Sequence, residues 1–296
     1  MTERSYEQLG NRGVVTIAGE DRKAFLQGLI SNDIEKIAAD RAIWSALLTP
    51  QGKYLHDFFV VEIGDTLYLD CEADRLMDFG KRLHRYKLRA QVELGIGEDQ
   101  AIFALFGDEA LSTLGLADEA GVARSIGGGI VYVDPRLPRA GARALLPAAG
   151  AAELIEGLGF SAGSPNDYDA LRLALGLSDG SRDLIVEKST LLESNFDELH
   201  GVDWEKGCYM GQELTARTKY RGLVRKRLMP VRIEGPVPET GTPLIAGDKE
   251  IGEMRSGSGR RGLALIRLER LAEVGEMDVL AGEARVFPEK PDWAEY

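Results

Sequence analysis

The chain has 296 residues, of which 44% are hydrophobic, and its formal net charge is −12. This length and composition predict a folded protein with a sizeable core and room for two or three lobes, and they exclude a disordered chain. The acidic excess repels phosphate backbones, and no stretch reaches the roughly 20 apolar residues that span a bilayer. Direct nucleic-acid binding and membrane insertion are therefore not expected. The polar opening has no signal-peptide core, which predicts a cytoplasmic protein.

The first part of the chain alternates short strands with amphipathic helices. Residues 14–19 are rich in β-forming residues, and the next ten residues place Phe25 and Leu29 on one stripe at helical spacing. Residues 74–86 show the same helical spacing. Further short β-rich runs, separated by turn residues, lie at 44–49, 57–63, 66–70 and 91–96. We therefore predict a first α+β lobe over residues 1–98.

A similar alternation recurs in the next part of the chain. Strand patterns alternate with helix patterns at 100–106, 108–114, 130–133, 142–146, 151–158 and 167–174. The stretch 183–200 is polar and has little apolar periodicity, and long connections of this kind often form the walls of binding clefts. The pattern predicts a second, similar α+β lobe over residues 99–222, with a cleft between the two lobes.

The pattern changes again after residue 222. Residues 224–233 alternate between apolar and polar, and prolines and glycines separate short strands further on, while helical periodicity fades. These features predict a small β-barrel over 223–287, within a C-terminal domain of residues 223–296 that ends in an acidic tail. The predicted fold class is thus α+β, with two similar lobes followed by a small barrel.

The cysteine and histidine content argues against a metal site held by this chain alone. Cys71 and Cys208 lie far apart and form no CxxC pair, and the three histidines are scattered. The set does not match the four-ligand patterns of zinc or iron–sulfur sites, so no tightly bound metal is expected. The sequence leaves open whether the two cysteines pair with each other.

The most informative stretch is KGCYMGQELTAR at residues 206–217. A lysine two positions from Cys208 and nearby glycine amides favour the thiolate form and are typical of an accessible, reactive cysteine. A buried cysteine beside a glycine turn is the alternative. On a helix, Glu213 and Arg217 would pair across one turn for about 0.2–0.5 kcal/mol. These two residues and Gln212 are also candidates for holding the Cys208 loop in one shape.

This motif resembles the signature of the YgfZ family, folate-binding proteins of iron–sulfur cluster assembly that are related to the T-protein of the glycine cleavage system. The residues that carry the resemblance are Lys206, Gly207, Cys208, Gly211, Gln212, Glu213 and Arg217. Segments similar to the family's opening segments and to the closing barrel of the T-protein group lie at residues 19–34, 48–58, 252–259 and 263–266. The resemblance implies a T-protein-like folate-binding region, with Cys208 and Lys206 as the residues that carry the chemistry and the other motif residues in support.

The resemblance also implies a tetrahydrofolate site. A pterin ring needs a flat apolar slot and a carboxylate or amide that accepts hydrogen bonds from its nitrogens. In the T-protein group an acidic residue of the long connection does this, and Glu193 occupies the similar place here. Asn32 and Asp33 of the opening segment and Arg172 before the connection are weaker candidates for lining the slot. Asp57 is a further candidate.

Two departures from the T-protein bear on mechanism. That enzyme carries a pair of aspartates where this chain has His56 and Asp57, and it lacks the Lys-Gly-Cys signature. Our leading hypothesis is therefore a tetrahydrofolate-binding accessory factor in iron–sulfur cluster assembly or repair. Its partners would be assembly proteins or cluster-containing enzymes. The sequence leaves open whether Cys208 and a partner bridge a transient cluster. The alternatives are a folate-dependent aminomethyltransferase and a scaffold without a ligand, and whether a reaction is catalysed is left open.

Overall fold

The computed structural model describes residues 4–222, 224–275 and 277–296, and the chain divides into two compact units. Unit 1 contains the chain up to Leu48 together with Leu55–Pro165 and Leu199–Met210. Unit 2 contains Thr49–Tyr54, Asn166–Glu198 and Gly211–Tyr296. The predicted boundary between residues 98 and 99 falls inside unit 1. The division between the two units passes through the Cys208 motif, directly after Met210.

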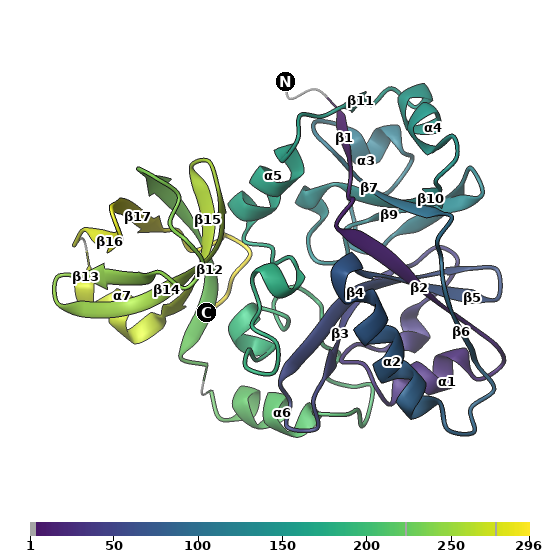
Figure 1. The fold of residues 1–296 in the computed structure, drawn as a ribbon, viewed down its shortest axis with the longest axis horizontal. Helices are drawn as coiled ribbons and strands as arrows, with labels where there is room; N and C mark the ends of the chain where they lie inside the picture. Colours follow the sequence, from purple (N-terminus) through teal and green to yellow (C-terminus); the bar gives the residue numbers. More distant parts are fainter. Residues whose placement is uncertain (1–3, 223, 276) are drawn as a thin grey trace. The chain divides into compact units, whose positions relative to one another are not determined.

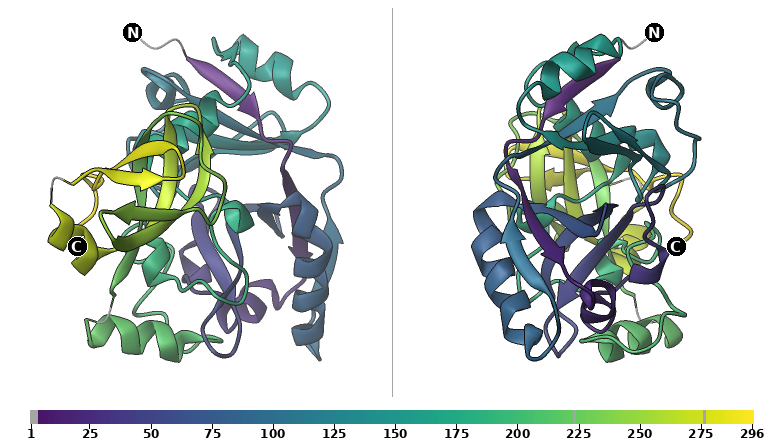
Figure 2. Two further views of the ribbon diagram at one scale, coloured as in Figure 1. Left: turned by 60° about the vertical axis from the view of Figure 1, so that its left-hand side comes forward. Right: turned by 90° about the vertical axis from the view of Figure 1, so that its right-hand side faces the viewer.

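Unit 1 holds a five-stranded sheet in the order β3-β4-β5-β2-β6. Its strands are β2 (Arg12–Ala18), β3 (Ile43–Leu48), β4 (Tyr54–Ile63), β5 (Thr66–Glu72) and β6 (Glu93–Ile96). Helix α2 (Leu76–Lys87) runs alongside this sheet (Figures 1 and 2). Its apolar residues recur at helical spacing, so Phe79 is buried against the rings of His56 and Phe58, with centroid distances of 4.9 and 4.8 Å. The short helices before α2 are α1 (Arg22–Gln27), η1 (Ile34–Lys36) and η2 (Ala73–Arg75).

A six-stranded sheet in the order β11-β1-β7-β10-β9-β8 forms the rest of unit 1. Its strands are β1 (Ser5–Gln8), β7 (Gln100–Phe106), β8 (Ala123–Ile126), β9 (Gly129–Val133), β10 (Ala142–Pro147) and β11 (Ser161–Ala162). The helical elements are α3 (Ala110–Thr113), η3 (Pro138–Ala140) and α4 (Ala151–Gly157). Strand β1 pairs antiparallel with β7, so the start of the chain completes the second sheet while β2 enters the first. The first residues of the chain therefore contribute to both sheets of unit 1.

A buried ion cluster joins the two sheets of unit 1. Asp70 of β5 accepts hydrogen bonds from Arg12 of β2 and from Arg143 of β10, each at 2.6 Å, and all three side chains are at most 3% exposed. The Arg143 guanidinium also lies over the Phe59 ring, 4.1 Å from its centroid. Buried charges persist when they are paired and hydrogen-bonded, so this cluster holds the two sheets in one arrangement.

The C-terminal part of unit 2 is a closed barrel in the order β12-β15-β14-β13-β16-β17 (Figure 1, green to yellow). Its strands are β12 (Lys226–Glu234), β13 (Pro243–Ala246), β14 (Lys249–Ser258), β15 (Arg261–Arg267), β16 (Val279–Ala281) and β17 (Ala284–Pro288), and α7 spans Leu268–Val274. Inward-facing residues such as Val231, Leu244 and Ile266 form its core. The predicted barrel is confirmed, and the α+β class is confirmed with it.

The remainder of unit 2 is mostly the long connection. Helix α5 (Asp167–Leu175) precedes it and α6 (Gln212–Tyr220) follows it. Between them the chain forms two short 3-10 turns, η4 (Gly180–Arg182) and η5 (Leu192–Ser194). Among the helices that the structure describes, none has the length and apolar character needed to cross a membrane.

Candidate functional site

Cys208 lies on an irregular segment between η5 and α6, and its side chain is exposed. Two main-chain hydrogen bonds tie this segment to the turn that follows α1. The Asp203 N–H donates to the Ser31 carbonyl and the Met210 N–H donates to the Gly28 carbonyl, each at 3.0 Å. One of these bonds lies before Cys208 in the sequence and the other lies after it, so the loop is held at both ends. The thiol between them is exposed to solvent.

The Lys206 side chain fastens the same loop. Its ammonium donates to the carbonyl oxygens of Ile30 and Asn32, each at 2.6 Å, and lies 5.3 Å from the centroid of the Tyr209 ring. Burial lowers the pKa of Lys206 to about 8. The sequence predicted a cation that acts on Cys208, whereas the observed contacts of the ammonium are with main-chain oxygens. These contacts are those of a residue that positions the loop.

The predicted ligand residues of unit 1 have internal partners. The Asn32 amide donates to the carbonyls of Trp44 at 2.8 Å and His200 at 2.7 Å, and the Asp33 carboxylate accepts from the Glu35 N–H in η1 at 3.1 Å. Asp57 is buried and accepts from the Trp44 indole N–H at 3.1 Å. Asn32, Asp33 and Lys206 are thus brought together around the turn after α1. Their contacts shape this turn and the Cys208 loop.

The two cysteines differ in environment. Both are free, which answers the question of pairing that the sequence left open. Cys71 is buried in β5, and burial raises the pKa of its thiol to about 12, so it behaves as an apolar core residue. Cys208 is the exposed one. The alternative of a buried Cys208 is therefore wrong.

The other end of the motif begins helix α6 of unit 2. Gly211 precedes the helix with a φ of +81°, and Gly207 has a φ of +92°, a region that favours glycine. Glu213 and Arg217 form the predicted ion pair across one turn, and both side chains are largely exposed. This pair accounts for Glu213 and Arg217 of the motif by helix stabilisation. A role of Gln212, Glu213 and Arg217 in holding the Cys208 loop stays a prediction.

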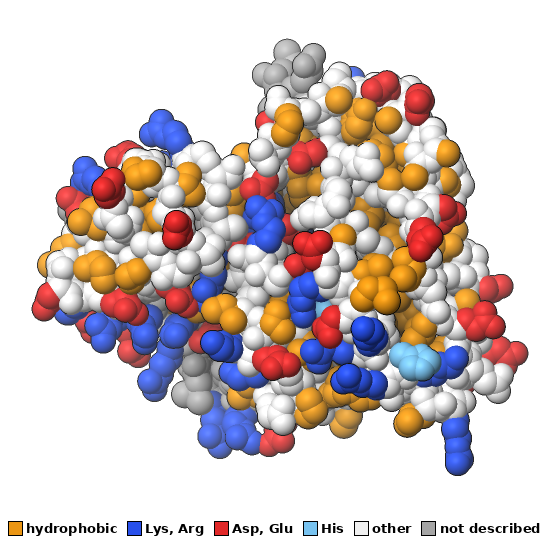
Figure 3. Space-filling view, viewed as in Figure 1, with side chains coloured by type: hydrophobic (Ala, Val, Ile, Leu, Met, Phe, Trp, Pro, Cys, Tyr) orange, Lys and Arg blue, Asp and Glu red, His pale blue; other side chains and the backbone are white. Residues whose placement is uncertain are grey.

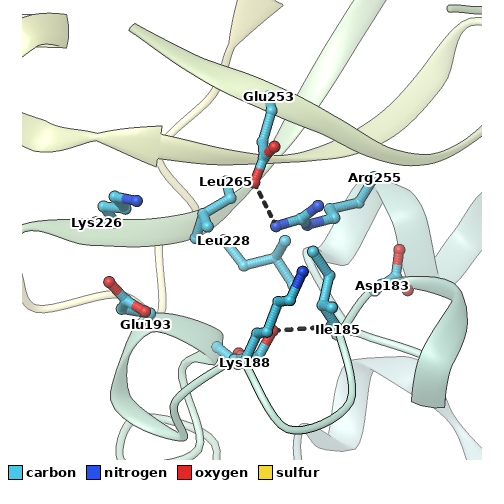
Figure 4. A pocket seen from close by; sticks show the side chains of 11 residues that line it. Asp183, Ile185, Lys188, Glu193, Lys226, Leu228, Glu253, Arg255 and Leu265 are labelled. Carbon is cyan, nitrogen blue, oxygen red and sulfur yellow. Dashed lines mark hydrogen bonds and ion pairs between the residues drawn. The ribbon is translucent and has the colours of Figure 1, made fainter. Parts of the chain in front are cut away.

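A pocket of about 190 Å³ lies within unit 2, between the long connection and strands β12, β14 and β15 (Figure 4). Glu193 lines it, and its carboxylate accepts from the Thr190 hydroxyl at 3.0 Å. The side chains of Leu228 and Leu265 form the apolar part of the pocket wall. Arg255 of β14 also lines the pocket and pairs with Glu253 at 2.6 Å. The pocket therefore combines a carboxylate, apolar surface and a cation.

Two pocket lysines were missed by the sequence reasoning. Lys188 and Lys226 line the pocket, and neither ammonium makes a hydrogen bond or ion pair with the residues that the structure describes. In Figure 4 the Lys188 side chain points toward the middle of the pocket. Strand alternation could have suggested Lys226, because it shares a face of β12 with Leu228. Periodicity could not indicate which face of the strand borders a pocket.

Arg172 does not line this pocket. Its side chain is 2% exposed, and its guanidinium donates to Asp169 at 2.6 Å, Asp183 at 2.8 Å and Ser256 at 3.0 Å. Asp183 also accepts from the Ser256 N–H at 3.1 Å. These contacts fasten the connection to β14 of the barrel, and the predicted folate contact at Arg172 stays a prediction.

Within the described residues, no group of three or more His, Cys, Asp or Glu side chains is arranged to hold a metal ion.

The family described as CAF17, C-terminal beta-barrel domain, matches residues 225–296. The fold resembles the glycine cleavage system aminomethyltransferase T from Bartonella henselae, with a TM-score of 0.77, 16% identity and coverage of 99% of this chain and 87% of that one. At this identity the likeness shows the fold alone, and the predicted T-protein-like architecture is confirmed.

The relatives in sequence identify the family more narrowly than the likeness in fold does. The chain is 33% identical over 249 residues to the Neurospora crassa protein named iron–sulfur cluster assembly factor IBA57 homolog, mitochondrial, covering 78% of this chain but only 55% of the relative. It is 32% identical over 309 residues to the Homo sapiens IBA57, mitochondrial, covering 97% of this chain and 84% of the relative. The prediction of a cytoplasmic protein is wrong on this comparison, since these relatives are mitochondrial by name. The relatives do not favour the aminomethyltransferase alternative. The chain belongs to the family of the iron–sulfur cluster assembly factor IBA57.

Proposed function

We propose that this protein is an accessory factor in iron–sulfur cluster assembly or repair, in which Cys208 supplies one thiolate to a cluster shared with a partner protein. The observation that carries the proposal is the exposed Cys208 on a loop fastened at both ends. The relatives named as iron–sulfur cluster assembly factors support the process. The partner would be an assembly protein or a cluster-containing enzyme.

The chemistry asked of Cys208 is simple ligation. Its thiol gives up a proton to water, and the sulfur then donates an electron pair to iron. Clusters are commonly held by four cysteine ligands, so a single thiolate requires the partner to supply the others. The Lys206 contacts with Ile30 and Asn32 support this role by restricting the loop before the partner arrives. A loop ordered in advance reduces the entropy lost on binding.

Tetrahydrofolate binding in the unit 2 pocket is the second part of the proposal. The Glu193 carboxylate is suited to accept hydrogen bonds from a pterin ring, Leu228 and Leu265 to cover its face, and Lys188 and Lys226 to meet the carboxylates of the glutamate tail. The volume of about 190 Å³ suits the ring system, with the tail extending to solvent. When bound, tetrahydrofolate supplies one-carbon carrier chemistry, and these residues would bind and orient it.

The cysteine role is tested by complementation. In cells that lack the native protein, Cys208→Ser should fail to restore the activity of cluster-dependent enzymes, because the hydroxyl is a poor ligand for iron. Cys71→Ala serves as the matched control, since it also removes a thiol but leaves the exposed loop intact, and it should restore activity if it folds. Full restoration by Cys208→Ser would reject the ligand role.

The folate role is tested separately by calorimetric titration with tetrahydrofolate under anaerobic conditions. Saturable binding by the wild-type protein should weaken by about tenfold or more in Glu193→Gln, which removes a charged acceptor from the pocket. Glu239→Gln makes the same change at an exposed position that does not line the pocket, so it should bind as the wild type does. Absence of binding would reject the folate part and leave the cysteine part standing.

A further inference from the structure

A second concave surface lies in unit 1, between helix α2 and strand β6. The cavity has a volume of about 450 Å³, and its apolar lining is formed by Val15, Leu76, Met77, Leu94 and Ile96. We call it the α2–β6 groove. Met77 is 59% exposed and Ile96 is 46% exposed, so apolar side chains meet water here. Exposed apolar surface gathered in a concavity is typical of a binding site.

Glycine keeps the groove open on its helical side. Gly80 of α2 borders the cavity, and a Cβ built at this position would have no atom within 4 Å. Glycine costs about 1 kcal/mol relative to alanine in a helix interior. A side chain at position 80 would strengthen the helix and extend into open space. The position therefore offers a way to fill the groove without disturbing the fold.

The opposite side of the groove is the edge of a sheet. β6 is the last strand in the order β3-β4-β5-β2-β6, and it pairs with β2 in the antiparallel register Val15↔Ile96. The Gly97 N–H donates to the Val14 carbonyl at 3.0 Å. Because main-chain groups of a strand alternate between its two edges, those of Leu94 and Ile96 face the outer edge. An extended segment can pair with such an edge through main-chain hydrogen bonds.

The charge of this surface is opposite to that of the protein. Helix α2 and the residues after it carry a series of cationic side chains that make no hydrogen bond or ion pair with any described residue: Lys81, Arg85, Lys87 and Arg89. The acidic residue of α2, Asp78, already contacts His56 and Arg82. Figure 3 shows Lys and Arg side chains gathered over α2 beside a hydrophobic area. On a chain of net charge −12, this concentration of unpaired cations selects for an acidic ligand.

We propose that the α2–β6 groove binds an extended segment of a partner protein, which adds to the outer edge of β6, places apolar side chains in the groove and directs acidic side chains to the cations of α2. An apolar cavity beside a free strand edge fits an alternating peptide better than a nucleic acid or a lipid surface, because both of those lack strand-like main-chain donors and acceptors. The inference is independent of Cys208 and of folate.

The test uses the full chain and a fluorescent synthetic peptide that alternates Val or Ile with Asp or Glu, followed by anisotropy at low and high salt. The wild-type protein should bind it saturably, and more weakly at high salt. Lys81→Glu combined with Arg85→Glu should weaken binding by about tenfold or more. Arg270→Glu on α7 is an exposed control that should leave the affinity unchanged.

Two further probes separate the apolar and main-chain contributions. Gly80→Met should fill the groove and abolish binding while preserving thermal stability, so a loss of binding cannot be attributed to unfolding. A peptide with N-methylated amides at alternate positions should bind at least tenfold more weakly, because it cannot complete the ladder with β6.

Several results would overturn the proposal. These are no saturable binding of the acidic peptide, equal binding of a peptide with Lys in place of Asp and Glu, or equal binding by Gly80→Met. Tighter binding of single-stranded DNA or of phosphatidylserine vesicles would assign the surface to another class of ligand. A concentration-dependent dimer that is lost in Gly80→Met would identify a second copy of this chain as the occupant.

Discussion

Acidification should destabilise this protein through one buried histidine. His56 lies on β4 with 2% of its side chain exposed, and its Nε2 is 2.9 Å from an Asp78 carboxylate oxygen. Burial lowers the pKa of His56 to about 4, the positive charge of Arg75 adds to the effect, and Asp78 opposes it. His56 is therefore neutral in the folded protein at physiological pH.

The sign and size of the effect follow from linkage. In the unfolded chain histidine takes up its proton near pH 6.5, whereas the folded protein does so near pH 4. The contribution of His56 to the free energy of unfolding is complete above pH 6.5. It is lost as the pH falls toward 4, because only the unfolded state binds the proton in this interval. Each pH unit of this interval contributes about 1.4 kcal/mol, so the total loss is about 3 kcal/mol.

The assay is urea unfolding at a series of pH values from 7 to 4 for the wild type and for His56→Gln, which keeps a polar side chain beside Asp78. The free energy of unfolding of the wild type should fall by about 3 kcal/mol more than that of the variant across this range. His84→Gln is the matched control on α2, since its ring is exposed, and its curve should parallel the wild type. If the curves of wild type and His56→Gln are parallel instead, then burial does not keep His56 neutral.

Three further predictions concern the core and the Cys208 loop. Asp70→Asn leaves two buried arginines without their carboxylate, and it should lower the free energy of unfolding by about 3–5 kcal/mol. The control is Asp65→Asn, whose ion pair is exposed, and it should lower the free energy of unfolding by less than about 1 kcal/mol. Lys206→Met removes two hydrogen bonds that fasten the loop, and it should speed proteolytic cleavage there, as followed by mass spectrometry. A maleimide should modify Cys208 in the native protein and Cys71 only after unfolding.

Each of these predictions has a result that contradicts it. If Asp70→Asn and Asp65→Asn lower the free energy of unfolding equally in urea, then the buried ion cluster around Asp70 does not stabilise the packing of the two sheets. An unchanged cleavage rate in Lys206→Met would show that the main-chain bonds alone hold the loop. Native modification of Cys71 at the rate of Cys208 would contradict its burial in β5.

Local patterns were sufficient to predict much of the fold. The helical spacing of residues 74–86 predicts α2, and the observed helix Leu76–Lys87 buries Phe79 and Leu83. The change to short strands after residue 222 predicts the barrel, which begins at Lys226. These features depend on side chains within one or two turns or strands of one another, so periodicity reports them directly. The resemblance carried by the KGCYMGQELTAR motif predicts a role in iron–sulfur cluster assembly, and the names of the relatives support this process.

The α+β class, the barrel and Cys208 as the candidate residue can all be predicted from sequence, because each is carried by a contiguous segment. The packing of distant segments, by contrast, makes β1 complete the second sheet and brings Asp70 to both sheets. It also brings the ammonium of Lys206 to the carbonyls of Ile30 and Asn32, 176 and 174 residues away, and surrounds Arg172 with acidic side chains. The physical reason is that the partner of a buried charge or of an edge strand is set by the packing of distant segments, which local spacing does not encode.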